Sequence, residues 1–397
     1  MTDIHGTSRR EFLAASAFGF LGLARGSKRL SLRQESQVGE ELLYVGTYTE
    51  DTQSKGIYLL RFDSRSGQLR QIDAFDAGPN PSFLAIHPDG NALYAVNEVG
   101  NYAGKSSGGV TAFSVAPQSG ALARIGAQAS EGAGPCYVSV DKSGRALLVA
   151  NYDAGSIALL PIQSGGAIAA ATSVVQHKGS GPIKDRQSEP HAHCIVTDRT
   201  NRFALAADLG ADRVFVYRLD LSEKALQHVE NAEGVMRAGA GPRHIAFHPT
   251  STLVFVSNEL DSTVTALRFD AKRGSLTALD TQSTLPAGWK GTNYPADIHV
   301  APSGRTVYVS NRGHNSIAAM SITSAGRLSL KQTISTEGDW PRNFTIDPTG
   351  RWVLVANQKS NSIVVLTRDA RSSRLTATQS RIEIPSPVCL RFRAHSA

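Results

Sequence analysis

Aromatic and β-branched residues fall in short runs along the chain, and Gly, Pro, Asn and Asp separate these runs. Apolar runs of this kind, bounded by turn residues, are typical of β-strands. Amphipathic windows with the helical period are scarce beyond the N-terminus. The pattern therefore predicts an all-β protein.

One apolar hairpin recurs along the chain. Its copies align without a gap from a turn residue, mostly Pro, to an Asn or Asp sixteen residues later. Turns such as "HPDG", "APSG" and "DPTG" separate the two strands, because Pro fixes φ and Gly accepts positive φ. The six copies are Pro81–Asn97, Pro135–Asn151, Ala192–Asp208, Pro242–Asn258, Pro295–Asn311 and Pro341–Asn357.

A second hairpin, such as "GIYLLRFDSRSGQL" or "SIVVLTRDARSSRL", occurs seven times. The missing first hairpin is divided between the chain ends. "ELLYVGTY" (Glu41–Tyr48) resembles its second strand and "SPVCLRF" (Ser386–Phe392) resembles its first. Seven four-stranded antiparallel units, the last closed by both termini, predict a seven-bladed β-propeller. We expect this single domain to span residues 41–394, with no free edge in the closing blade.

The polar ends of the first hairpin vary between copies. The start of its first strand and the end of its second lie at one end of a blade, so both sets should line one mouth of the channel. The positions after the Pro are Ser82, Cys136, His193, Arg243, Ala296, Arg342 and Val388. Those after the Asn are Glu98, Tyr152, Leu209, Glu259, Arg312, Gln358 and, for the split blade, Thr47.

The predicted mouth collects three arginines, a histidine and two carboxylates, which are His193, Arg243, Arg312, Arg342, Glu98 and Glu259. His191, His244 and Asn343 adjoin these positions. Titratable groups converging on one cavity indicate a binding or catalytic site. The alternative interpretation is a ring of structural ion pairs.

The motifs "YVGTYT", "PHAHCIVTDRTNRFALAADLGADRVFVYRLD", "GAGPRHIAFHPTSTLVFVSNEL" and "WPRNFTIDPTG" resemble the lactonase family of seven-bladed propellers. That family includes 6-phosphogluconolactonase and carboxymuconate-lactonizing enzyme. The resemblance implies a site at His193, Arg243, Glu259 and Arg312, and the repeat register selects His193 over His191. From their places at or beside the mouth positions, we expect His191, Arg342, Asn343, Glu98 and His244 to bind substrate.

Hydrolysis of a lactone needs a water molecule, a base and stabilisation of an oxyanion. Arginines suit an oxyanion or an anionic substituent. A Glu among arginines should be ionised, whereas a His can change charge near neutral pH. The residues leave open whether Glu259 or His193 activates water.

Two alternatives to lactone hydrolysis remain. One is lactone formation or opening on a muconate-like dicarboxylate, and the other is a non-catalytic propeller that binds an anion or a protein. No G-x-S-x-G motif indicates a serine hydrolase. We expect no metal and no cofactor, and we expect Cys136, Cys194 and Cys389 to be buried apolar residues.

The N-terminus, "SRREFLAASAFGFLGLA", resembles a twin-arginine export signal, with Arg9 and Arg10 before a short apolar run. We assign residues 1–33 to this signal and a linker, and expect recognition by the twin-arginine export machinery and a periplasmic location. This segment has a net charge of +4, out of the formal net charge of +7 for the whole chain. The remaining charge does not favour nucleic acid as a partner, and we expect a monomer that acts on a small lactone.

Overall fold

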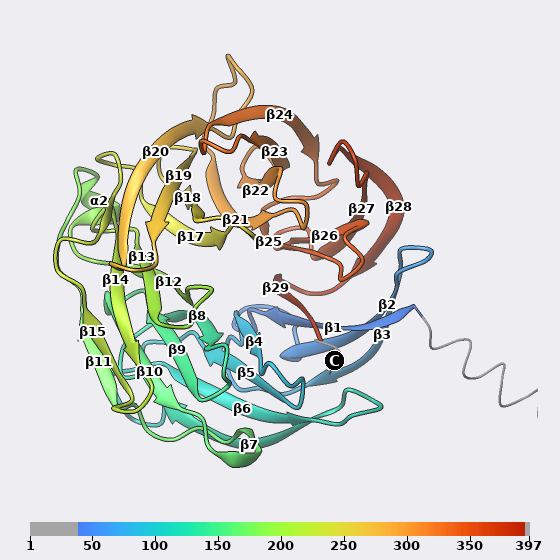
Figure 1. The fold of residues 1–397 in the computed structure, drawn as a ribbon. Coiled ribbons are helices and arrows are strands. Elements are labelled where there is room, and N and C mark those ends of the chain that lie inside the picture. The colour runs from blue at the N-terminus through green and yellow to red at the C-terminus, as the bar shows by residue number, and fades with distance from the viewer. Residues whose placement is uncertain (1–38, 394–397) are drawn as a thin grey trace, which may run out of the picture. The chain divides into compact units, whose positions relative to one another are not determined.

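The computed structural model describes residues 39–393, which form seven antiparallel sheets around a common axis (Figure 1). The innermost strands contact one another in the closed order β29, β4, β8, β12, β17, β21, β25 and back to β29. The predicted seven-bladed β-propeller is therefore confirmed.

The blades follow one another in chain order. The first two contain β1 (Glu40–Thr47), β2 (Ile57–Asp63) and β3 (Gln68–Phe75), then β4 (Leu84–Ile86), β5 (Ala92–Asn97), β6 (Gly109–Val115) and β7 (Leu122–Ala129). The third contains β8 (Pro135–Val140), β9 (Ala146–Asn151), β10 (Ser156–Pro161) and β11 (Ser173–Gln176). The fourth contains β12 (Ala192–Thr197), β13 (Phe203–Asp208), β14 (Arg213–Asp220), β15 (Ala225–His228) and the short fifth strand β16 (Gly234–Val235).

The last three blades each have four strands. They are β17 (Pro242–Phe247), β18 (Leu253–Asn258), β19 (Thr263–Asp270) and β20 (Ser275–Ser283); β21 (Tyr294–Val300), β22 (Thr306–Arg312), β23 (Ser316–Ile322) and β24 (Leu328–Ser335); and β25 (Pro341–Ile346), β26 (Trp352–Asn357), β27 (Ser362–Arg368) and β28 (Leu375–Glu383). Two single helical turns, Ser164–Gly166 and α2 (Lys184–Gln187), lie between strands of the third and fourth blades.

Strand β29 (Pro387–Phe392) supplies the innermost strand of the first blade. It pairs antiparallel with β1, and Leu43 lies opposite Phe392. Closure by both ends of the propeller segment is thereby confirmed.

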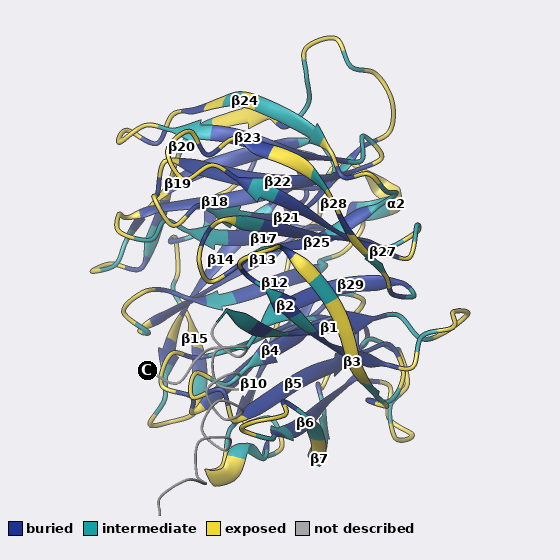
Figure 2. Ribbon diagram, turned by 90° about the vertical axis from the view of Figure 1, so that its right-hand side faces the viewer, coloured by how far each residue is buried: buried dark blue, intermediate teal, exposed yellow. Residues whose placement is uncertain are grey.

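The hydrophobic core lies between neighbouring blades. One cluster joins Leu43 and Phe62 of the first blade to Leu354 and Val365 of the seventh. The middle strands have both faces covered, so β5, β9, β13 and β18 are buried along their whole length, whereas the outer strand β3 is mostly exposed (Figure 2). Strands buried on both faces explain the continuous apolar runs of the repeat.

A β-bulge follows the first residue of the innermost strand in most blades. In β17 the register shifts between Pro242, which pairs with Asn258, and His244, which pairs with Ser257, so that Arg243 is the extra residue. The same shift makes His193 and Arg342 the extra residues of β12 and β25. Bulges redirect a side chain out of the ladder, which explains why this position varies between repeats.

The repeated Asn has a structural role. The side chain of Asn97 donates to Ala77 O at 2.7 Å and that of Asn357 to Thr336 O at 2.9 Å. Each acceptor belongs to the linker that enters the same blade, so the Asn fixes the linker against the strand. This contact needs an amide at one position and leaves the following residue free to vary.

In the blade that is closed by both chain ends, the mouth position lies one residue later in the sequence than predicted. Thr47 pairs with Pro387, as each repeated Asn pairs with its Pro, and its hydroxyl donates to Gly56 O at 2.6 Å. Thr47 therefore occupies the Asn position, and the prediction that it lines the mouth is wrong. Tyr48, the next residue, takes the mouth position.

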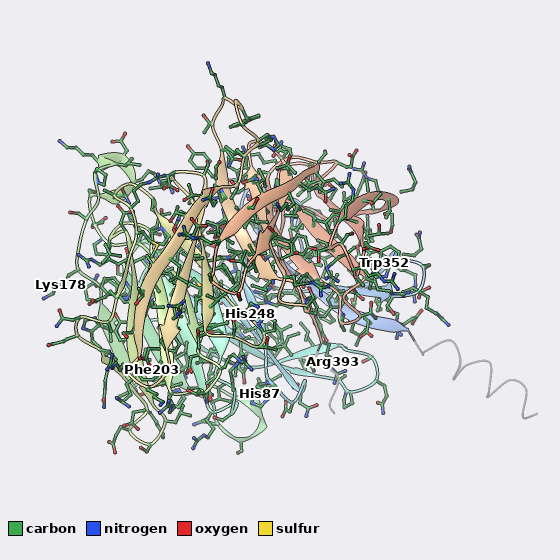
Figure 3. All side chains as sticks on the ribbon, turned by 45° about the horizontal axis from the view of Figure 1, so that its top comes forward. His87, Lys178, Phe203, His248, Trp352 and Arg393 are labelled. Atoms are coloured by element: carbon green, nitrogen blue, oxygen red, sulfur yellow. The ribbon has the colours of Figure 1, made fainter. Side chains whose placement is uncertain are left out.

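The hairpin turns at the other end of the blades connect neighbouring blades. His248 Nε2 lies 2.9 Å from Gly304 O, and His87 Nε2 lies 3.0 Å from Gly144 O (Figure 3). Trp352 Nε1 donates to Ser64 O at 2.9 Å. These side chains join successive blades at the end of the hairpins opposite to Arg243.

Candidate active site

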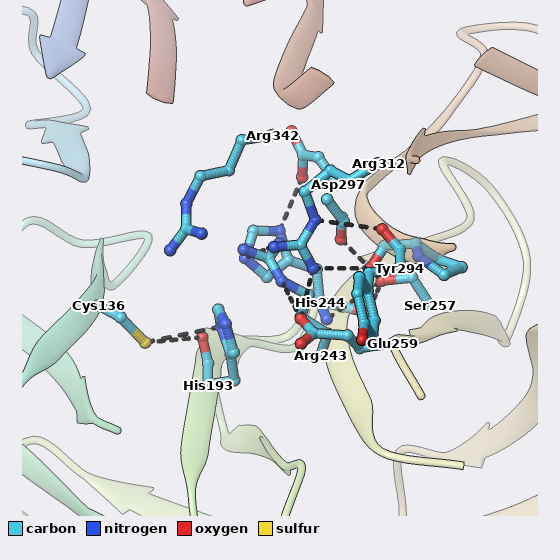
Figure 4. Close-up of polar contacts among 12 residues, drawn as sticks. Cys136, His193, Arg243, His244, Ser257, Glu259, Tyr294, Asp297, Arg312 and Arg342 are labelled. Atoms are coloured by element: carbon cyan, nitrogen blue, oxygen red, sulfur yellow. Dashed lines mark hydrogen bonds and ion pairs between the residues drawn. The ribbon is translucent and has the colours of Figure 1, made fainter. Parts of the chain in front are cut away.

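The candidate site centres on the carboxylate of Glu259, which is buried and follows the last residue of β18. Arg312 Nη2 donates to its Oε2 at 2.6 Å, and Arg243 Nε forms an ion pair with the same oxygen at 3.0 Å. Arg186 Nη2 donates to Oε1 at 2.6 Å. Three guanidinium groups from three parts of the chain therefore share one carboxylate, and Figure 4 shows two of them, Arg243 and Arg312, beside Glu259.

This environment keeps Glu259 ionised. Burial by itself raises the pKa of Glu259, but the charges of Arg312, Arg243 and Arg186 outweigh it and hold that pKa well below 4.5. Burial also lowers the pKa of Arg312, to about 9, so its guanidinium stays protonated at neutral pH. The expected ionised carboxylate is confirmed, and its basicity is low.

The backbone that leads into Arg243 requires a glycine two residues earlier, at position 241. Gly241 has φ of +65°, and a Cβ at this position would lie 2.5 Å from Leu260 Cγ. Glycine is the residue that accepts both conditions. The bulge then directs Arg243 to Glu259, and the side chain of Arg243 is 2% exposed.

A second polar layer lies beneath Arg243. Arg243 Nη1 is 3.1 Å from His244 Nε2, and His244 Nδ1 is 2.8 Å from Asp297 Oδ1. Arginine only donates, so Nε2 of His244 must be the acceptor and Nδ1 must carry the proton. Burial, followed by Arg243, lowers the pKa of His244 to about 3, which agrees with this neutral tautomer.

Asp297 is the end of this chain of contacts. Its oxygens accept hydrogen bonds from Asn343 Nδ2 at 2.5 Å and from the backbone of Ile298 at 3.0 Å, and one lies 3.0 Å from His299 Nε2. Asn343 Oδ1 accepts from Leu390 N at 2.7 Å, so it fixes β29 rather than facing solvent. His244 and Asn343 thus orient the site from below.

His193 lies beside this cluster, with its ring centroid 5.4 Å from those of His244 and Tyr152. Its Nδ1 is 3.6 Å from Cys136 Sγ, while Nε2 has no hydrogen-bond partner among residues 39–393. Burial and the neighbouring Arg243 hold the pKa of His193 well below 6.5. The expectation that His193 changes charge near neutral pH is therefore wrong, because the imidazole stays neutral.

Across the mouth, Arg342 and Glu98 are joined through Tyr48. Arg342 Nη2 donates to the Tyr48 hydroxyl at 2.8 Å, and that hydroxyl lies 3.0 Å from both oxygens of Glu98. Ser82 Oγ donates to the same carboxylate. The positive charge of Arg342 is balanced here by the carboxylate of Glu98.

His191 stacks on Tyr152 with ring centroids 4.5 Å apart, and its Nδ1 lies 3.0 Å from Tyr152 O. All nine residues predicted from the sequence therefore lie in one polar region, in three groups centred on Glu259, Tyr48 and Tyr152. Cys136, Cys194 and Cys389 are unpaired and buried, and burial raises the pKa of Cys136 well above its ordinary value.

The sequence patterns missed three contributors. Tyr48 was missed because the split-blade register was shifted by one residue. Asp297 lies two residues after Pro295, and comparing that second position between repeats would have placed it beside His244 and Asn343. Arg186 lies in the segment between β11 and β12, outside the repeats, so no register could locate it.

Residues 39–393 contain no group of three or more His, Cys, Asp or Glu side chains arranged to hold a metal ion. In the same range, no helix is long and apolar enough to cross a membrane.

Comparison with known proteins places the chain in one family. The family described as "Lactonase, 7-bladed beta-propeller" matches residues 42–392. The chain is 34% identical to a protein named 6-phosphogluconolactonase from Bacillus subtilis (strain 168), over 88% of this chain and 97% of that one. It is 32% identical to one of the same name from Formosa agariphila, over 89% and 100%.

Among solved structures, the periplasmic gluconolactonase of Pseudomonas aeruginosa superposes with a TM-score of 0.83. The two are 34% identical, and the alignment covers 89% of this chain and 99% of that one. A structure from Lactobacillus plantarum gives a TM-score of 0.82 at 34% identity, over 89% and 99%. The chain therefore belongs to the lactonase family of seven-bladed β-propellers.

Proposed function

We propose that this protein hydrolyses the lactone of a sugar acid at the mouth of the propeller channel. The observation that carries the proposal is the neutral His193, with a free Nε2, beside a buried cluster of arginines held by Glu259. The names of the relatives support hydrolysis over muconate-type ring closure and over a binding propeller without activity.

In the proposed reaction His193 is the general base. Its Nε2 takes a proton from water, which attacks the lactone carbonyl. Glu259 is less suited to this role, because Arg186 and Arg312 each donate to one of its oxygens and Arg243 forms an ion pair with it. Arg243 stabilises the oxyanion, which collapses as the ring C–O bond breaks and the ring oxygen receives the proton from His193.

The other predicted residues hold this arrangement or bind substrate. Glu259 and Arg312 fix the guanidinium of Arg243 from one side, and His244 fixes it from below. Glu98 and Arg342, linked by Tyr48, offer an acceptor and donors to sugar hydroxyls, and His191 borders the same space.

The test is hydrolysis of gluconolactone by the purified protein, followed by acid release in a pH-stat against the spontaneous rate in buffer. We expect catalysed hydrolysis that His193→Ala lowers by about 10² or more while the fold is kept. Hydrolysis at the buffer rate with every lactone offered would refute the proposal.

We further propose that the protein is exported to the periplasm by the twin-arginine route. The signal assigned to residues 1–33 lies outside the described residues, and support comes from Arg9 and Arg10 and from the periplasmic relative. Replacing both arginines by lysine should leave an uncleaved precursor in the cytoplasm, because the export receptor reads the arginine pair. Periplasmic recovery of this variant at the normal level would contradict the assignment.

A further inference from the structure

Cys136 and His193 occupy equivalent positions in neighbouring blades. In β8 the register shifts between Pro135, which pairs with Asn151, and Tyr137, so that Cys136 is the extra residue. His193 is the extra residue of β12 in the same way, and β8 and β12 lie side by side. The two bulges direct both side chains out of their ladders, and the thiol and the imidazole meet between the blades.

Three neighbouring side chains enclose the imidazole of His193, which is 5% exposed. Cys136 Sγ lies 3.6 Å from its Nδ1 (Figure 4). The rings of Tyr152 and His244 pack against it edge to face, at interplanar angles of 77° and 69°. The ring orientation is therefore fixed, with Nδ1 toward the thiol and Nε2, across the ring, away from it.

The surroundings of the sulfur indicate where the hydrogens lie. Burial raises the pKa of Cys136, so the sulfur keeps its hydrogen at neutral pH. Sγ lies 3.6 Å from the carbonyl oxygen of His193 and 3.8 Å from that of Ala192. A carbonyl oxygen only accepts, so the thiol hydrogen has an acceptor there, and the sulfur lone pairs remain for an Nδ1–H group.

The opposite arrangement, in which the thiol donates to Nδ1, would put the imidazole hydrogen on Nε2. That nitrogen has no hydrogen-bond acceptor within residues 39–393. Buried N–H groups without a protein acceptor are rare, and less well satisfied acceptors are more common. The contacts therefore favour a proton on Nδ1.

We propose that Cys136 is a positioning residue, whose sulfur accepts a hydrogen bond from Nδ1–H of His193 and so keeps the lone pair of Nε2 available to take the proton from water. This inference rests on the proposed function. The hydrogen bond made by one ring nitrogen of a histidine decides which nitrogen carries the proton. A thiol does this without adding a negative charge to the buried site.

The experiment measures gluconolactone hydrolysis by four variants. Cys136→Ala and Cys136→Val both remove the acceptor, and valine keeps the space filled, whereas Cys136→Ser restores an acceptor. Cys389→Ala is the control, because Cys389 is an equally buried thiol of β29. Its sulfur accepts from Leu84 N at 3.3 Å and has no hydrogen bond to His193 within the described part of the chain.

For Cys136→Ala and Cys136→Val we expect kcat to fall roughly 2- to 10-fold, the range for losing one hydrogen bond between neutral groups. KM should not change, because the thiol acts on the base and not on the lactone. Cys136→Ser should recover most of kcat, and Cys389→Ala should match wild type.

Nitrogen NMR of protein labelled at its histidines reports the tautomer directly, and the His193 signals are those missing from His193→Ala. We expect a protonated Nδ1 and an unprotonated Nε2 in wild type and in Cys136→Ser. Cys136→Ala and Cys136→Val should show a mixture of the two tautomers. A purely structural role of the thiol would leave these signals unchanged.

Unchanged kcat in both Cys136→Ala and Cys136→Val would overturn the proposal, as would an equal loss in Cys136→Ser. A protonated Nε2 in an active wild-type protein would also overturn it, because the thiol would then be the donor. A wild-type protein that hydrolyses no lactone would instead refute the proposed function, and the tautomer measured by NMR would still test the contact with Cys136.

Discussion

Glu259→Gln removes the charge that holds three guanidinium groups but keeps nearly the same shape. Arg243 and Arg312 are buried beside it, and their side chains are 2% and 6% exposed. After the substitution these two cations remain buried without a carboxylate at their centre. The perturbation therefore tests whether Glu259 organises the site.

The expected loss of stability comes from the two buried pairs. Breaking a buried ion pair by removing one partner costs about 3–5 kcal/mol. The pair with Arg186 adds little because that side chain is partly exposed to water. With an unfolding entropy of about 0.7 kcal/mol/K for a chain of this length, the melting temperature should fall by roughly 4–7 °C.

The effect should depend on pH in one direction. Folding lowers the pKa of Glu259 well below 4.5, so its stabilisation is fully present above the unfolded pKa. It is lost only as the pH falls through the lower pKa of the folded state. The difference in melting temperature between wild type and Glu259→Gln should be constant near neutral pH and shrink in acid.

The assay is thermal unfolding followed by circular dichroism, with gluconolactone hydrolysis measured on the same samples. Glu40→Gln is the control, because Glu40 pairs with Arg61 at 2.8 Å on a partly exposed surface and should cost less than about 1 kcal/mol. We expect Glu259→Gln to lower turnover by about 10² or more, since Arg243 loses its orientation. Equal melting temperatures for wild type and Glu259→Gln at neutral pH would refute the reasoning.

His193→Ala should reduce turnover by about 10² or more. His248→Ala should keep its activity and lose only the stability that an inter-blade hydrogen bond contributes. An equal loss of activity in both variants would contradict the placement of the site. Asp297→Asn should lower the free energy of unfolding, measured in urea, by about 1–3 kcal/mol, because an amide NH₂ would face buried donors. An unchanged unfolding midpoint would argue against the inferred His244 tautomer. Deleting residues 386–397 should yield insoluble protein, because the first blade loses its innermost strand; a soluble product with the wild-type melting temperature would contradict closure by β29.

The sequence by itself determined the architecture. Each blade must bury both faces of its middle strands, so the apolar body repeats, and the Pro-to-Asn spacing marks each hairpin. The turn residues and the split hairpin at the chain ends were enough to predict seven blades and their closure. The same register placed His193, Arg243, Glu259 and Arg312 at one mouth, because their positions follow from strand pairing alone.

Only the tertiary structure decided which of these groups pair and which titrate. Glu259 receives Arg186 from a segment outside the repeats, and Asp297 reaches His244 from the neighbouring blade. The neutral state of His193 depends on its burial beside Arg243, and no local pattern encodes burial at a channel mouth. Contacts between blades and the desolvation that follows from them exist only once the ring has closed.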